Sequence, residues 1–364
     1  MQFIKQYRKL LFYLLIIALF VLFQNNPVWI ETIYIPWVYN PFSVFLRYIT
    51  SVFSFSVGDV FYIVFGSWVL YKIVQQFRYL KQNLNGKQLF WIKTIYPLLC
   101  FFCKAFIVFK LFWGLNYSRQ GVATQFNCKK EGYCKEQLNS FIDDLIEQVN
   151  YTRSLISDTS LPKIEVKTSI DLAIKEYEGI SKEITFLKYL QPSVKPSLYS
   201  KLGNYVGFVG YFNPFSGEAQ VRNDIPEILI PFIATHEIAH QLGYASESEA
   251  SFIGYVVCNS SKNNYVKYSL QLELLALALS ELPIKYLEDG CAEQIRPRFY
   301  QINDCLSKQV KTDRKLISLF FERNKTSLSE VSNNLYDSYL KLNSQYTGIN
   351  SYNEVLDWVI SFKN

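Results

Sequence analysis

The sequence predicts an α-rich α+β domain that follows three N-terminal transmembrane helices. Two observations lead to this prediction. Apolar residues are concentrated in the N-terminal third of the 364-residue chain, in three long segments. The rest of the chain has the spacing of amphipathic helices, interrupted by one glycine-rich, aromatic stretch typical of strands, residues 205–221. We therefore divide the chain into a membrane domain, residues 1–114, and an outer domain, residues 115–364.

The composition indicates that lipid solvates part of the molecule. The chain is 50% hydrophobic and 17% aromatic but only 19% charged, and typical soluble domains are roughly 25% charged. The net charge of +6 owes much to lysines between the apolar segments. The outer domain has no basic stripe with interleaved aromatic residues. We therefore expect the lipid bilayer as a partner and no nucleic acid.

The three apolar segments are residues 10–23, 49–71 and 94–113. A membrane-spanning helix needs about 20 residues, so the second and third segments qualify by length. The first is shorter and follows a basic tail, as in a signal peptide. However, residues 24–29 offer no small-x-small cleavage site, so we favour an uncleaved anchor.

The distribution of basic residues predicts the orientation. The N-terminal tail and residues 72–93 are basic, whereas the loop between the first two segments carries only Arg47. The positive-inside rule places both basic stretches in the cytoplasm. We therefore predict a multi-pass protein of the cytoplasmic (inner) membrane, with its C-terminal domain outside the cytoplasm. The basic residues counted are Lys5, Arg8, Lys9, Lys72, Arg78, Lys81, Lys87 and Lys93.

Three charged residues fall inside the predicted spans: Asp59 in the second, and Lys104 and Lys110 in the third. Charges at membrane depth call for a partner. An ion pair between Asp59 and one of the lysines is one hypothesis. Snorkelling of each side chain to the outer surface is the other.

The seven cysteines fit this topology. The two in the third apolar segment are expected to act as small apolar residues. Cys128 is close enough in sequence to bridge with Cys134 in an oxidising compartment. The same holds for Cys291 and Cys305. That leaves Cys258, which we expect as a buried thiol on a helix.

Hydrophobic spacing predicts the elements of the outer domain. Apolar residues three and four apart indicate amphipathic helices at 138–149 and 170–180. Residues 205–221 are read as a strand followed by a turn at 213–217. Residues 270–282 are apolar but too short for a membrane span, so we predict a buried core helix.

Two further helices are predicted on either side of a glycine. The first runs from about residue 226 to residue 242 and ends at Gly243. The second opens at Ser246, where Glu249 three residues later would complete a capping box, and continues to about Cys258.

The strongest signal in the sequence lies on the first of these helices. The chain contains only two histidines, His236 and His240, and Glu237 stands between them. Random placement would put two histidines four apart roughly once in two hundred cases, before any glutamate is required. Positions i and i+4 share a helix face, so both imidazoles can reach one metal ion. This pattern is typical of zinc peptidases, with Glu237 as general base for a metal-bound water. A surface helix with two satisfied histidines is the alternative.

Zinc requires a third protein ligand and one open position. No third histidine exists, and Glu247 and Glu249 lie on the first turn of the next helix. Glu247 shares its face with Ala250, Ser251 and Gly254, whose small size would allow close packing against the histidines. Glu249 shares its face with larger apolar residues and could serve only as a favourable charge at a helix N-terminus. We prefer Glu247, with Glu249 as the alternative ligand and Ser251 as support for the site.

The chain resembles a family of uncharacterised bacterial membrane proteins that combine N-terminal spans with an HExxH zinc-peptidase domain. The resemblance covers most of the length and implies a zincin-like α+β domain with a Zn²⁺ site, but no substrate. The motifs that carry it are Ser56-Val57-Gly58-Asp59, Trp113-Gly114-Leu115-Asn116-Tyr117, residues 210–219, residues 236–243, Tyr339-Leu340-Lys341-Leu342-Asn343, Gly348 and Ser351-Tyr352.

A second resemblance concerns the third ligand. The run Glu247-Ser248-Glu249-Ala250 is similar to the E-x-E-A-D stretch of heat-shock-type membrane zinc peptidases, whose first glutamate binds metal. Ser251 stands where those proteins have aspartate.

In zinc peptidases an edge strand usually precedes the active-site helix and pairs with an extended substrate. Residues 205–221 occupy that place, and a plain core hairpin is the alternative. Tyr211 and Asn213 are the candidate substrate-binding residues. For stabilisation of the oxyanion, Tyr211, Tyr244 and Arg222 are the candidates.

These observations predict a membrane-anchored zinc metallopeptidase that hydrolyses bonds of a peptide or protein substrate. Glu237 would deprotonate the metal-bound water and then protonate the leaving amine. The alternative is a non-catalytic, metal-stabilised envelope scaffold or sensor, which would have no need of Glu237. An intramembrane protease ranks last because the apolar run before His236, residues 228–234, is too short to span.

Overall fold

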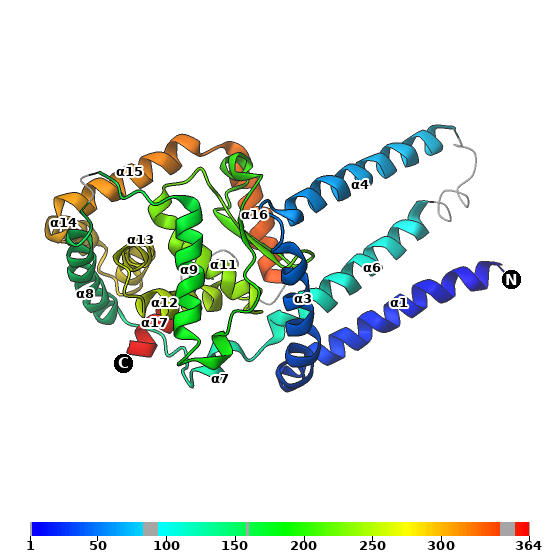
Figure 1. Cartoon of the computed structure of the whole chain (residues 1–364), viewed down its shortest axis with the longest axis horizontal. Coiled ribbons are helices and arrows are strands. Elements are labelled where there is room, and N and C mark those ends of the chain that lie inside the picture. The colour runs from blue at the N-terminus through cyan, green and yellow to red at the C-terminus, as the bar shows by residue number, and fades with distance from the viewer. Residues whose placement is uncertain (1, 83–93, 158–159, 343–353, 364) are drawn as a thin grey trace.

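Three long helices project from one side of a mostly helical domain in the computed structural model (Figure 1). They are α1 (Gln2–Gln24), α4 (Val57–Gln82) and α6 (Tyr96–Phe112). The C-terminal end of α1, the N-terminal end of α4 and the C-terminal end of α6 all meet the domain. The described residues are 2–82, 94–157, 160–342 and 354–363. Outside them lie Lys87 and Lys93 of the basic stretch and the motif residues Asn343, Gly348, Ser351 and Tyr352.

Two helices in the described part of the chain are long and apolar enough to cross a membrane. They contain the windows Tyr7–Gln24 in α1 and Val57–Tyr79 in α4. Helix α6 has 17 residues, and at 1.5 Å per residue it covers about 25 Å of a hydrocarbon core of about 30 Å. The expectation of three spans is thus supported for two helices only.

Helix α4 begins later than the sequence indicated. The second apolar segment was expected to start at residue 49, but Thr50 ends a separate helix, α3 (Asn40–Thr50). The Ser56 hydroxyl accepts a hydrogen bond from the Asp59 backbone N–H at 3.1 Å, which caps the first turn of α4. Hydropathy does not register such a break, because the loop between the helices is also apolar.

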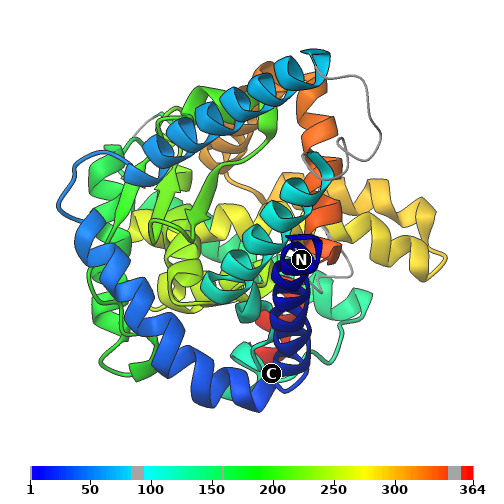
Figure 2. The ribbon, with the colours of Figure 1, turned by 90° about the vertical axis from the view of Figure 1, so that its right-hand side faces the viewer.

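A continuous helical run connects α1 to α4 and was not anticipated. It comprises α2 (Pro27–Trp29), the π-helix η1 (Ile30–Tyr39) and α3. The run crosses the ends of the long helices instead of continuing them (Figure 2). Its inward face buries Ile30, Tyr34, Ile35 and Tyr39, which form a small hydrophobic cluster with Trp113.

A three-stranded sheet lies beside this run. Its strands are β1 (Val194–Pro196), β2 (Gly210–Asn213) and β3 (Glu218–Val221), in the order β1-β3-β2. β1 is parallel to β3, and β2 is antiparallel to β3 with Tyr211 opposite Gln220. The predicted strand and turn are therefore a hairpin with β2 at the edge. Residues 205 and 206 belong instead to the short helix α10 (Gly203–Val206).

Helix α11 (Ile230–Gln241) occupies the centre of the domain, and every one of its residues is buried. It packs against the sheet and against α9 (Val166–Ile180), α12 (Glu247–Asn259) and α13 (Asn264–Glu288). The predicted helices 138–149, 170–180 and 270–282 are confirmed. The other longer helices are α8 (Lys135–Ser154), α14 (Ala292–Cys305), α15 (Lys308–Asn324), α16 (Ser327–Leu342) and α17 (Val355–Lys363). The short ones are η3 (Gly114–Ser118), α7 (Gly121–Gln125), η4 (Thr185–Leu187), η5 (Ser200–Leu202) and η6 (Glu227–Leu229).

All seven cysteines are free thiols, so both predicted disulfides are wrong. Cys291 and Cys305 stand at opposite ends of α14, and 14 helical residues separate them by about 20 Å. Cys134 is exposed at the N-cap of α8, whereas Cys128 packs against the core. Cys258 is buried on α12, as expected, next to the Thr235 hydroxyl.

The hypothesis of an ion pair between Asp59 and a lysine of α6 is also wrong. The Asp59 carboxylate accepts hydrogen bonds from the Leu198 backbone N–H at 2.7 Å and from the Tyr211 hydroxyl at 2.5 Å. Lys110 donates to Gln24 at 2.8 Å, and the Lys104 ammonium lies 5.7 Å from the Tyr13 ring centre. Asp59 therefore connects the first turn of α4 to the edge strand.

Candidate metal centre

The helix that carries both histidines is held from its C-terminal end by the N-terminal third of the chain. The Tyr39 hydroxyl donates to the His240 carbonyl at 3.1 Å, and the Ser43 hydroxyl donates to the Gln241 carbonyl at 3.2 Å. Arg119 donates to the Leu242 carbonyl at 3.1 Å. These donors satisfy carbonyl groups that the end of a helix leaves without intrahelical partners. Helix α11 thus presents its side chains from a fixed backbone.

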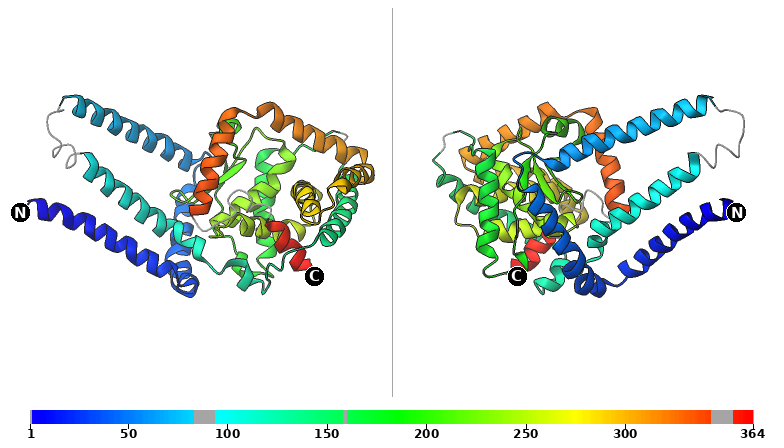
Figure 3. Two further views of the ribbon diagram at one scale, coloured as in Figure 1. Left: turned by 180° about the vertical axis from the view of Figure 1, so that it is seen from behind. Right: turned by 45° about the vertical axis from the view of Figure 1, so that its right-hand side comes forward.

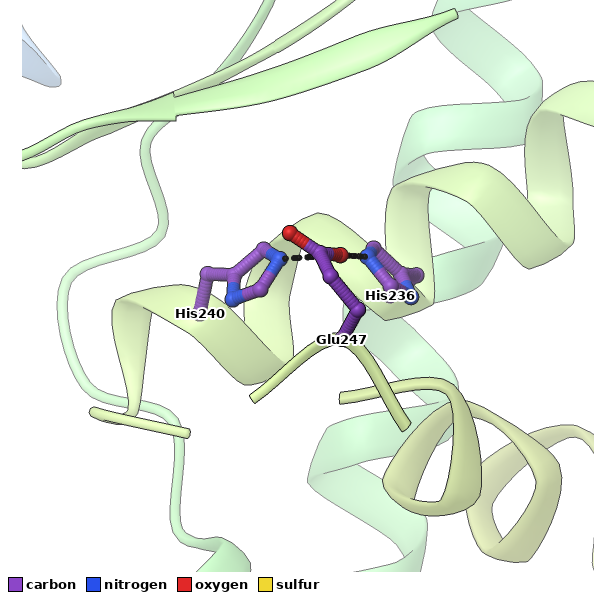
Figure 4. Close-up of side chains that lie close together, drawn as sticks. All are labelled: His236, His240 and Glu247. Carbon is purple, nitrogen blue, oxygen red and sulfur yellow. Dashed lines mark hydrogen bonds and ion pairs between the residues drawn. The ribbon is translucent and has the colours of Figure 1, made fainter. Parts of the chain in front are cut away.

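His236, His240 and Glu247 converge on one point between α11 and α12 (Figure 4). One carboxylate oxygen of Glu247, Oε2, lies 3.1 Å from His236 Nε2 and 3.4 Å from His240 Nε2. One ligand atom from each residue lies within 4.8 Å of the others, and all three residues are buried. Zinc bonds of about 2.0–2.1 Å at tetrahedral angles place donor atoms about 3.3 Å apart. The group therefore has a spacing that could hold a metal ion.

The remaining ring nitrogens fix the orientation of the imidazoles. His240 Nδ1 lies 2.6 Å from the Tyr244 carbonyl, which can only accept, so this nitrogen carries a proton, and Nε2 is the ring nitrogen that faces Glu247. His236 Nδ1 lies 3.0 Å from the Ser251 hydroxyl. Such partners on the far side of the ring are the usual support of metal-binding histidines. Ser251 thus supports the site by contacting His236. The sequence had suggested that Ser251 would support Glu247 instead.

Glu247 reaches the histidines because α12 folds back closely onto α11. The chain reverses at Gly243, whose φ of +88° favours glycine. At Gly254, a Cβ atom would come within 3.1 Å of the Phe232 ring and 3.6 Å of the His236 backbone nitrogen. The small residues noted on this face of α12 therefore do permit the close packing that the sequence predicted. The second oxygen of Glu247 accepts a hydrogen bond from the Tyr336 hydroxyl at 2.6 Å.

Glu249, the alternative third ligand, points away from the histidines. Its carboxylate accepts a hydrogen bond from the Val122 backbone N–H at 3.2 Å. Burial raises the pKa of Glu249 to about 7. The expected capping box is not formed, because Glu249 is engaged at α7 and the Ser246 hydroxyl lies against Ser248.

Glu237 lies beside the convergent group and is almost fully buried. A Cβ atom on Gly210 of β2 would approach Glu237 Oε1 to 2.6 Å, so the edge strand passes directly over this carboxylate. The other oxygen, Oε2, has no hydrogen-bond partner among the described residues. Burial raises the pKa of Glu237 to about 8. A divalent cation nearby would favour the ionised carboxylate instead.

A cleft of about 1020 Å³ opens onto these residues. Its lining comes from the edge strand and the loop before it, from α11 and α13, and from α15 and α16. These elements can be followed in the ribbon of Figure 3. Aromatic and aliphatic side chains dominate the lining. The residues that line the cleft near the metal group are Trp113, Tyr117, Phe208, Gly210, Tyr211, Phe212, His236, Glu237, His240, Glu247, Tyr336 and Tyr339.

The other predicted site residues are mostly outside the cleft. Tyr211 lines it, but its hydroxyl is bound to Asp59. Asn213 is fully buried and accepts hydrogen bonds from backbone N–H groups of the hairpin turn at 2.9 and 3.3 Å. Tyr244 donates to Gln125 at 2.6 Å, and Arg222 is paired with Asp224. None of these last three is placed to contact a substrate in the cleft.

The sequence did not indicate Tyr336 as a site residue, and it indicated Tyr339 only as part of the C-terminal motif shared with the resembled family. Both lie on α16 and line the cleft opposite the edge strand. Their spacing of three places the two rings on one helix face, where they stack. That spacing was a usable signal for a shared face, although it could not indicate which face of the fold α16 would cover.

Comparison with known proteins gives a family but no activity. No curated protein matches the chain. No solved structure matches it either. The model of a family described as "Protein of unknown function (DUF3810)" matches residues 34–360, most of the chain. That description does not mention a peptidase, so the activity expected from the HExxH motif remains a proposal. The chain belongs to the DUF3810 family.

Proposed function

We propose that this protein is a membrane-anchored zinc metallopeptidase with its active site outside the cytoplasm. The observation that carries the proposal is the buried His236, His240 and Glu247 group with Glu237 beside it, at the base of a large cleft. Two imidazoles and one carboxylate are the ligand set of one class of catalytic zinc sites, which keep a further position open.

The choice of zinc rests on the donors. Imidazole nitrogen suits zinc and other late transition metals, whereas magnesium and calcium prefer sites composed of oxygen ligands. The buried position of all three donors favours a resident ion over a loosely held one. The partners of the two Nδ1 atoms, Ser251 and the Tyr244 carbonyl, hold the rings for ligation through Nε2.

Glu237 would carry the proton transfers. Zinc, when bound, lowers the pKa of a water molecule to about 7 and polarises the carbonyl under attack. The carboxylate of Glu237 accepts a proton from the attacking water and passes it to the amine nitrogen as the C–N bond breaks. The carboxylate is thereby regenerated. Glu237 is suited to this role because one of its oxygens has no competing partner among the described residues.

The edge strand would align the substrate. β2 is one of the two edge strands of the described sheet, the other being β1, and its residue Gly210 lies against Glu237. An extended peptide that adds to such an edge runs along the cleft with its backbone held by main-chain hydrogen bonds. Tyr336 and Tyr339 line the cleft as well, and the Tyr336 hydroxyl holds the third ligand by donating to Glu247 Oε1.

The membrane placement follows from the long helices and the basic residues. Helices α1 and α4 contain apolar windows long enough to span a bilayer. The ends of α1, α4 and α6 that meet the outer domain are those assigned to the outer side by the positive-inside rule. This arrangement supports the proposed position of the candidate metal centre outside the cytoplasmic membrane.

The experiment that tests the proposal combines metal analysis with a broad peptide-library digest of the purified full-length protein. We expect bound zinc and metal-dependent cleavage that the Glu237→Gln variant loses while it keeps zinc. The Glu178→Gln variant, on the exposed face of α9, is the matched control. A metal-stabilised scaffold would bind zinc without cleavage, and Glu237→Gln would then behave like wild type wherever His236→Ala fails.

A further inference from the structure

The metal centre lies directly against the outer end of α6. Trp113, the C-cap residue of α6, has its ring centre 6.0 Å from that of His240 and 4.7 Å from that of Phe212 on the edge strand. Tyr39, on the run that crosses the helix ends, donates to the His240 carbonyl. A single layer of side chains thus separates the ligand His240 from the membrane-proximal elements.

The edge strand is joined in the same way to the outer end of α4. Glu218 on β3 accepts hydrogen bonds from the backbone N–H groups of Val57 and Gly58, at 3.1 and 2.5 Å, where α4 begins. Asp59, in the first turn of α4, accepts from Tyr211 on β2. Lys195 on β1 donates to the carbonyl of Thr50 at the end of α3 and to those of Phe53 and Phe55 in the loop before α4. All three strands are therefore tied to the start of a membrane helix.

The run between α1 and α4 has the character of an interfacial segment. It crosses the long helices at their outer ends (Figures 1 and 3). The run and the loop after it, residues 51–55, expose large apolar side chains, of which Trp37 is 78% and Val52 is 81% exposed. Aromatic residues concentrate at the membrane–water boundary, where amphipathic helices lie in the plane of the bilayer. The other exposed large apolar residues within 27–55 are Val28, Trp29, Ile33, Phe45, Tyr48, Ile49, Phe53 and Phe55.

From these contacts we infer that the enzyme cuts membrane-anchored polypeptides, within the few residues that emerge directly from the outer surface of the bilayer. The inference rests on the proposed peptidase function and adds the class of substrate. With residues 27–55 at the lipid boundary, the wall of the cleft formed by Trp113 and Phe212 begins at the bilayer surface. A chain that leaves the membrane beside α4 or α6 reaches the metal group within a few extended residues, at about 3.3 Å each.

The apolar lining of the cleft fits such a substrate. Residues next to a membrane anchor are rich in aromatic and aliphatic side chains, and the cleft presents the same kind of surface to them. Anchoring also raises the local concentration of the substrate at the site, an advantage that a freely diffusing peptide lacks.

The test uses the full-length protein in vesicles of phosphatidylethanolamine and phosphatidylglycerol. Two libraries share the same randomised segment of about ten residues. In one, this segment directly follows a single apolar helix of about 20 residues, long enough to span the bilayer; in the other it is free in solution. A third library places a flexible spacer of about 30 residues between helix and segment. Mass spectrometry reads the position and the rate of cleavage, with Glu237→Gln as the inactive control.

We expect cleavage of the directly anchored library at least tenfold faster than that of the free library, with the cut within about ten residues of the helix. The long spacer should bring the rate down toward that of the free segment. Equal rates for all three libraries would overturn the inference and leave the peptidase standing. No cleavage of any library would remove the proposed function and, with it, the inference.

A second measurement does not depend on turnover. Brominated lipids quench tryptophan fluorescence only over a short range, so they report side chains at the bilayer. We expect the quenchable emission to fall in Trp37→Phe and to stay unchanged in Trp358→Phe, whose ring is buried in the outer domain. If brominated lipids quench Trp37→Phe as strongly as wild type, the run does not lie on the membrane and the inference fails.

Discussion

Two clusters of buried carboxylates flank the β-hairpin, and they differ in how their oxygens are satisfied. At the junction between α4 and the sheet, each oxygen of Asp59 and Glu218 has a donor within hydrogen-bond distance. At the metal centre, Oε2 of Glu237 has none among the described residues, and Oε2 of Glu247 faces two ring nitrogens.

This difference separates a cluster that holds the fold together from one that is arranged for chemistry. Buried carboxylates that receive backbone and hydroxyl donors are stabilised in their charged form and need no further group. A buried carboxylate without donors is unfavourable unless a cation, a water or a substrate completes it. The carboxylates of the junction have all their hydrogen-bond donors within the protein, whereas Glu237 at the metal centre requires a cation, a water or a substrate.

The largest effect we expect is on catalysis at the metal centre. Glu237→Gln keeps the shape of the side chain but removes its ability to accept a proton. General-base catalysis contributes about 10²–10⁴-fold, so hydrolysis should fall by that order. The measurement is the rate of peptide cleavage at equal zinc content. Full activity in this variant would mean that Glu237, like Asp59, has only a structural role.

The next effect concerns the support of the third ligand. Tyr336→Phe removes the hydroxyl that donates to Glu247 Oε1. Loss of such a supporting partner typically weakens metal affinity by about 10–100-fold. Competition with a chelator should reveal the change, and Tyr300→Phe, exposed on α14, is the matched control. Unchanged affinity would mean that Tyr336 belongs to the cleft wall and not to the metal site.

A smaller effect is expected where the edge strand passes over Glu237. In Gly210→Ala the new Cβ would approach Glu237 Oε1 to 2.6 Å, so either the strand or the carboxylate must move. Overpacking of this kind costs about 1–3 kcal/mol, and we expect slower cleavage with the metal retained. Gly179→Ala, where a Cβ meets nothing within 4 Å, serves as control. Equal activity of the two variants would show that β2 does not position Glu237.

The smallest effect on function is predicted at the junction, where the change should appear in stability alone. Tyr211→Phe removes one donor to the Asp59 carboxylate, and hydrogen bonds to charged groups contribute about 1.5–3 kcal/mol. The free energy of unfolding in detergent should fall by that amount, while zinc content stays at the wild-type level. Tyr205→Phe, at an exposed site on α10, should leave stability unchanged. Loss of zinc in Tyr211→Phe would contradict the separation of the two clusters.

The sequence predicted the local part of the metal centre because that part is encoded by short spacings. His236, Glu237 and His240 fall on one turn of a helix, and Glu247 follows after the chain reverses at a glycine. The small residues near Glu247 indicated that the two helices pack closely. The helices 138–149, 170–180 and 270–282 could likewise be predicted from the spacing of their apolar residues.

The rest depends on contacts between distant parts of the chain, which leave no periodic trace. Tyr336 reaches Glu247 across 89 positions, and Asp59 meets Tyr211 across 152. The crossing run between α1 and α4 was hidden because its apolar residues divide between a buried face and an exposed one. The predicted Cys291–Cys305 disulfide failed because sequence distance ignored the rigid length of α14 between the two residues.

The central claim is that His236, His240 and Glu247 bind zinc, and metal analysis of the purified full-length protein tests it most directly. We predict one zinc ion per chain in wild type and in Glu249→Ala, whose carboxylate serves α7. Glu247→Ala should lose most of its zinc while circular dichroism confirms the helical fold. A folded Glu247→Ala variant with full zinc occupancy, or a folded wild-type protein that binds no metal, would contradict the account.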